Sequence, residues 1–79
     1  MGGRRAVTTV DARGLRCPAP VIRLARAAAD APPGTELTVL ATDPAAVHDV
    51  PAWARMRGHE MVSATEQDGV HSLTVRTHA

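Results

Sequence analysis

The spacing of apolar residues along the first half of the chain distinguishes segments that favour strands from segments that favour helices. Residues 5–11 contain a run of valine and threonine, which favours a pleated, half-buried strand. Over 18–30 the apolar positions fall at i, i+3, i+4 and i+7, the spacing of one helical face, and they are Val21, Leu24, Ala25 and Ala28. The short apolar run over 36–42, bounded by helix breakers, predicts a central strand.

The second half of the chain begins with a helix-start signal. Asp43 followed by Pro44 is typical of an N-cap acid with proline at the first helical position, so we expect a helix over 45–57 that ends at Gly58. Two further strands follow at 59–66 and 70–77. The Asp-Gly pair between them is a strong signal for a two-residue hairpin turn.

The predicted element order is β-α-β-α-β-β, an α+β two-layer sandwich with both helices on one face of a four-stranded mixed sheet. The first two strands should pair in parallel because a strand-helix-strand unit crosses over right-handedly. The end of the second strand, with Thr42 and Asp43, should then lie at the same edge as Cys17. We expect one domain over 1–79 with an ordered core over about 5–77.

The net charge, the hydrophobic pattern and the cysteine count indicate which classes of function are less consistent with this sequence. Nine basic residues, all arginine, against eight acidic residues leave a net charge of +1, too small an excess to indicate direct nucleic-acid binding. No stretch resembles a signal sequence or a membrane span, and a single cysteine cannot form an intramolecular disulfide. We therefore expect a soluble cytoplasmic protein.

The candidate chemistry centres on Cys17, where a turn ends and a helix begins. Gly14 gives the turn backbone freedom, and Pro18 and Pro20 stiffen the first helical turn. The positive end of the helix, its remaining amides and the Arg16 guanidinium favour the thiolate, so we predict a modestly lowered thiol pKa.

A purely structural cysteine is the simpler hypothesis for Cys17, because free cysteines are often buried and inert. A cysteine kept for packing would, however, need neither the glycine turn nor the two prolines. The histidines show no metal-binding spacing, and a small chain offers no evident cleft for a cysteine hydrolase. Asp43 is either a helix N-cap or a group near the thiol, and capping is the simpler prediction.

A longer motif then stands out. Residues 10–21 resemble the signature of the TusA/SirA family of small sulfur-carrier proteins, in which a cysteine in C-P-x-P follows G-L, and 41–45, 49–52 and 58–60 are similar to the family as well. The resemblance implies a sulfurtransferase that carries a sulfane sulfur on Cys17 as a persulfide. It implies that Pro18 and Pro20 frame the thiol and that Asp43 lies near it. We expect neither a metal nor a cofactor to take part.

A carrier needs a docking surface for other proteins. Arg13, Arg23 and Arg26 could meet an acidic rim on a sulfur donor such as a cysteine desulfurase or a rhodanese-like protein. A downstream acceptor protein, for instance in tRNA thiolation, would take the sulfur, and we expect a monomer. Two alternatives stay open: a regulatory or RNA-binding module without catalysis, and a thiol redox sensor.

Overall fold

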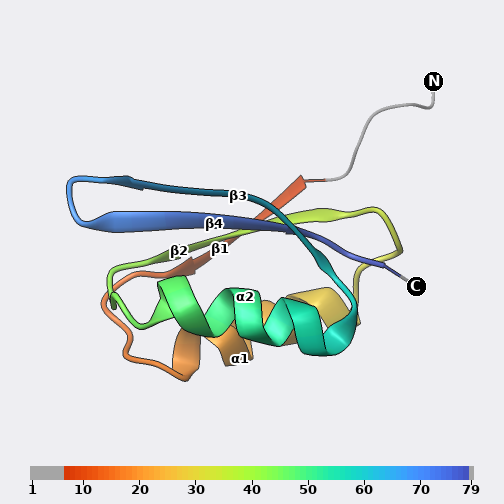
Figure 1. Cartoon of the computed structure of the whole chain (residues 1–79), viewed down its shortest axis with the longest axis horizontal. Helices are drawn as coiled ribbons and strands as arrows, with labels where there is room; N and C mark the ends of the chain where they lie inside the picture. Colours follow the sequence, from red (N-terminus) through yellow and green to blue (C-terminus); the bar gives the residue numbers. More distant parts are fainter. Residues whose placement is uncertain (1–6, 79) are drawn as a thin grey trace.

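Figure 1 shows two layers in the computed structural model, a sheet with two helices against one of its faces. The structure describes residues 7–78. The elements are β1 Val7–Ala12, α1 Ala19–Ala29, β2 Glu36–Ala41, α2 Ala46–Arg57, β3 Glu60–Gln67 and β4 Val70–Arg76. The predicted order and two-layer α+β architecture are confirmed; the predicted beginning of the first strand at Arg5 lies outside the described residues.

The sheet has the strand order β1-β2-β4-β3. β1 and β2 pair in parallel, and β4 runs antiparallel to both β2 and β3. The predicted parallel pair is therefore confirmed. Its last pair joins Ala12 to Ala41, so both strands end at the same edge and the segments that follow them lie together.

The core lies between the helices and the facing side of the sheet. Residues along β2 alternate between buried and half-buried, as a strand covered on one face requires. The core contains no phenylalanine or tyrosine, and its largest fully buried side chains include Leu24 of α1, Leu37 of β2 and Leu73 of β4. On α2 the buried residues are Ala46, Val50, Trp53 and Ala54.

Helix ends differ slightly from the predicted ones. α2 begins at Ala46, and its N-cap residue is Ala45 rather than Asp43. The chain after Asp43 makes a tight turn first, in which the Ala46 N–H donates to the Asp43 carbonyl at 3.0 Å. Neither helix within residues 7–78 is long and apolar enough to cross a membrane.

Candidate functional site

Cys17 lies in the turn between β1 and α1, directly before Pro18, the N-cap of α1. The Cys17–Pro18 peptide bond is cis. Gly14 has a φ of 80°, the left-handed region that glycine adopts readily, and its N–H donates to Thr42 Oγ1 at 2.9 Å. The turn that carries the cysteine is thus fastened to the segment that follows β2.

Asp43 makes the second fastening. Its Oδ2 accepts the Cys17 N–H at 2.8 Å, and its Oδ1 accepts the Ala45 N–H at 3.0 Å. These two backbone hydrogen bonds, together with the positive charge of Arg16, lower the pKa of Asp43. One carboxylate therefore supports the turn before α2 and also holds the backbone of Cys17. Asp43 is not the N-cap itself, but it lies next to the beginning of α2 and close to the cysteine.

The thiol of Cys17 is half-buried at the edge of the core. Desolvation raises its pKa to about 11, with further contributions from a hydrogen bond to Asp49, the charge of Asp49 and the charge of Asp43. The predicted lowering of the thiol pKa was therefore wrong. The carboxylates that the fold brings close favour the protonated thiol.

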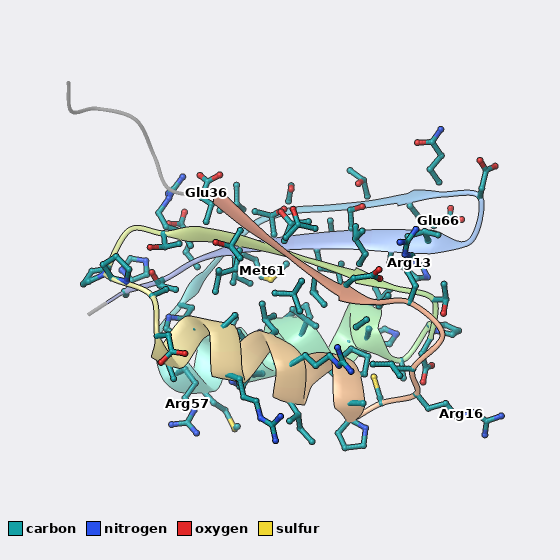
Figure 2. The ribbon with its side chains drawn as sticks, turned by 180° about the vertical axis from the view of Figure 1, so that it is seen from behind. Arg13, Arg16, Glu36, Arg57, Met61 and Glu66 are labelled. Carbon is teal, nitrogen blue, oxygen red and sulfur yellow. The ribbon has the colours of Figure 1, made fainter. Side chains whose placement is uncertain are left out.

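Two of the groups predicted to stabilise a thiolate, the Ala19 N–H and the Arg16 guanidinium, interact with other parts of the protein. Pro18 and Pro20 have no N–H, and the Ala19 N–H donates to the Arg16 carbonyl at 2.9 Å. Figure 2 shows the Arg16 side chain extending away from the body of the protein, and its charge acts on Asp43.

Asp49, in the first turn of α2, is the site residue that the sequence patterns did not single out. The available signal was its place near the beginning of a helix that starts at the cysteine edge of the sheet, where acidic side chains are common. Its effect on the thiol pKa depends on the tertiary packing that brings α2 close to the cysteine turn, which no local pattern reveals.

The three predicted docking arginines have different surroundings. Arg13 is paired with Asp11 through two hydrogen bonds of 2.9 Å, from Nε to Oδ1 and from Nη2 to Oδ2. Arg23 and Arg26 are exposed on α1, and Ile22 beside them is 45% exposed. The exposed side of α1 next to the cysteine turn thus combines two cations with an apolar side chain, whereas the charge of Arg13 is largely offset.

A cleft of about 440 Å³ opens beside the turn. Its lining comes from the two fastened segments: Gly14, Leu15, Arg16, Thr42, Asp43 and Pro44. Between residues 7 and 78 no group of three or more His, Cys, Asp or Glu side chains is arranged to hold a metal ion.

A two-layer α+β domain with one cysteine on a proline-flanked turn defines a small protein whose candidate chemistry depends on a single thiol. Comparison with protein families specifies the class, because residues 8–77 match the family described as Sulfurtransferase TusA. The chain belongs to this TusA/SirA family of sulfur-carrier proteins, as its motifs predicted.

Individual relatives agree. The chain is 43% identical over 68 residues to the sulfur carrier protein TusA of Pseudomonas fluorescens, which covers 86% of this chain and 82% of the relative. A putative sulfur carrier protein of Neisseria meningitidis serogroup A is 47% identical over 68 residues, covering 86% of this chain and 92% of its own. The crystal structure of a SirA-like protein from Desulfitobacterium hafniense superposes with a TM-score of 0.80 at 31% identity, covering 91% of this chain and 99% of that one.

Proposed function

We propose that Cys17 accepts a sulfane sulfur from a donor protein, holds it as a persulfide and passes it to an acceptor protein. The observation that carries the proposal is the way this one cysteine is held: the Asp43 carboxylate accepts its N–H at 2.8 Å while Cys17 stays partly exposed on the turn. Membership of a sulfur-carrier family supports the same role. A fixed backbone and an accessible sulfur are what transfer between two proteins requires.

Loading is a thiol exchange in which no net oxidation occurs. The Cys17 sulfur attacks the outer sulfur of the donor persulfide, the donor S–S bond breaks, and the donor cysteine leaves as a thiolate. The proton that the Cys17 thiol loses is taken up by the leaving donor thiolate or by water. In unloading, an acceptor thiolate attacks the outer sulfur of the Cys17 persulfide, and the S–S bond breaks. The Cys17 sulfur leaves as a thiolate and regains a proton.

The presence of a single cysteine protects the bound persulfide sulfur from attack by another thiol of the same chain. Cys17 is the only cysteine in the sequence. Since no second thiol of the same chain can attack the persulfide, the sulfur cannot be lost by closing an intramolecular disulfide. Discharge then depends on a thiol brought by another protein.

The high thiol pKa gives the resting carrier a low reactivity. At neutral pH a thiol with a pKa of about 11 is almost wholly protonated, and the protonated form is a poor nucleophile towards oxidants. A donor that brings positive charge to the carboxylates beside the sulfur would weaken their effect and favour the thiolate. The carrier would thus be activated by docking.

The donor is a protein of the cysteine desulfurase or rhodanese-like type, and its acidic rim meets Arg23 and Arg26. Reversing both charges to glutamate should slow sulfur loading, more strongly at low salt because surface electrostatics act mainly on the association rate. Arg55→Glu, at an exposed arginine of α2, is the matched control. Equal loading rates for all three proteins would reject this docking surface.

The decisive test measures intact mass after incubation with a cysteine desulfurase and cysteine. We expect a gain of one sulfur atom that reductant reverses and that Cys17→Ala abolishes without unfolding the protein. Sulfenic acid or mixed disulfides in place of a persulfide would instead indicate a redox sensor. Retention of every cellular activity in Cys17→Ser would indicate a regulatory or RNA-binding module. Delivery to tRNA thiolation is one route that the same assay can follow with candidate acceptors.

A further inference from the structure

A second cavity of about 330 Å³ lies between the C-terminal halves of α1 and α2. It is lined by Ala25, Ala28, Ala29, Trp53, Arg57 and His59. None of these residues lines the cleft beside Cys17. Figure 2 shows Arg57 at one end of the helical layer and Arg16 at the other, so the cavity is remote from the thiol turn.

The indole of Trp53 leaves an unsatisfied donor beside this cavity. Trp53 is 7% exposed, and its Nε1 is buried without a hydrogen-bond partner among the described residues. A buried donor without a partner costs about 1–3 kcal/mol, and native proteins leave few of them. The indole N–H therefore calls for an acceptor that residues 7–78 do not supply.

The other two polar residues of the lining also donate hydrogen bonds. Arg57 is exposed and forms no ion pair within residues 7–78. His59 Nδ1 accepts the His78 N–H at 3.2 Å, so in the neutral ring the proton is on Nε2, which can donate. The His59 and Trp53 rings are neighbours, with centroids 5.1 Å apart.

The rest of the lining is apolar, since it consists of three alanine methyl groups of α1. The volume falls in the lower part of the range typical of small-molecule sites, about 300–1,000 Å³. A ligand that matches such a cavity has acceptors at one end and a short hydrocarbon chain at the other.

We propose that this cavity binds a small organic monocarboxylate, whose oxygens accept hydrogen bonds from Arg57, His59 and Trp53 and whose apolar chain lies against the alanines. A single negative charge fits the site because Arg57 brings the only full positive charge to the lining at neutral pH. Desolvation, with the charges of His78 and Arg57, lowers the pKa of His59 and keeps its ring neutral there.

The surroundings of the cavity are compatible with an anion. Both helices end here, and helix C-termini carry partial negative charge. Two of the last four carbonyls of α2 are, however, already bonded, because the Ala54 and Arg55 carbonyls accept the N–H groups of His59 and Gly58. The indole nitrogen is covered by neighbouring atoms, so it donates to a ligand only after the lining of the cavity rearranges locally.

The experiment uses the fact that Trp53 is the only tryptophan of the chain, which also lacks tyrosine and phenylalanine. Its indole N–H gives one side-chain resonance in an ¹H–¹⁵N spectrum, and its fluorescence reports on this cavity alone. Sodium butyrate is the probe, with butyramide, inorganic phosphate and sodium chloride of equal ionic strength as comparisons. We expect a saturable shift of the indole resonance with butyrate, and binding at least about tenfold weaker with butyramide, which lacks the charge.

Variants locate the site. Arg57→Gln should weaken butyrate binding about tenfold, while Arg55→Gln, on the same helix but outside the lining, should bind like the original protein. No saturable shift, an equal shift with chloride, phosphate or butyramide, or equal binding by Arg57→Gln would overturn the proposal. Sulfur loading of Cys17, measured on the same samples, should be unchanged by Arg57→Gln, so the two proposals succeed or fail independently.

Discussion

Replacing Asp49 by asparagine tests the electrostatics of the thiol directly. Asparagine keeps the size of the side chain and one oxygen that can accept a hydrogen bond, but it removes the negative charge of Asp49. The pKa of Cys17 should fall. It should stay above its ordinary value, because desolvation, the largest cause of the increase, and the charge of Asp43 both remain.

The size of the effect on reactivity follows from the thiol pKa. An increase from 9.0 to about 11 reduces the thiolate fraction at neutral pH about 100-fold. Thiolates of higher pKa are better nucleophiles, with a Brønsted coefficient of about 0.4–0.5, which recovers about tenfold. Cys17 should therefore react about tenfold more slowly than an ordinary free thiol at neutral pH, and Asp49→Asn should recover part of that difference.

The assay is alkylation with iodoacetamide followed by intact mass across a pH series. Only one thiol can react, since the chain has one cysteine. The rate for the original protein should rise steeply towards pH 11, and the curve for Asp49→Asn should move to lower pH. Asp30→Asn, a carboxylate at the other end of α1, serves as the control. A midpoint at or below about 8.5 in the original protein, or identical curves for the original protein and Asp49→Asn, would refute this account of the thiol.

Three further predictions concern stability, each measured by urea denaturation. Leu24→Ala removes a side chain with no exposed surface and should lower the free energy of unfolding by about 2–5 kcal/mol; a loss below about 1 kcal/mol would mean that the core collapses around the gap. Gly14→Ala, at a φ of 80° with open space around the added Cβ, should cost about 1–2 kcal/mol through backbone strain alone, and an unchanged midpoint would show that the turn relaxes. Because the pKa of Asp43 is lowered, its contribution to stability is present above pH 3.8 and is lost as the pH falls below that value; Asp43→Asn should remove this part of the acid sensitivity, and an identical acid profile would contradict it.

The order of the elements could be predicted because its signals are local. The 3.6-residue period over α1, the apolar run of β2 and the Asp-Gly turn before β4 each depend on residues close in sequence. Glycine and proline mark the ends for the same reason. The beginning of α2 was misplaced because a tight turn after Asp43 and a true helical turn have similar sequence preferences.

Short sequence patterns were enough to define the turn that carries Cys17 and the strand pairing that brings Asp43 to it, since backbone geometry and crossover handedness follow from such patterns. The sign of the thiol pKa shift, by contrast, is a property of the packed molecule. It depends on desolvation and on Asp49, a residue of α2 that tertiary packing brings close to the cysteine turn. The cavity at Trp53 arises in the same way, because its walls come from both helices and no single stretch of sequence contains them.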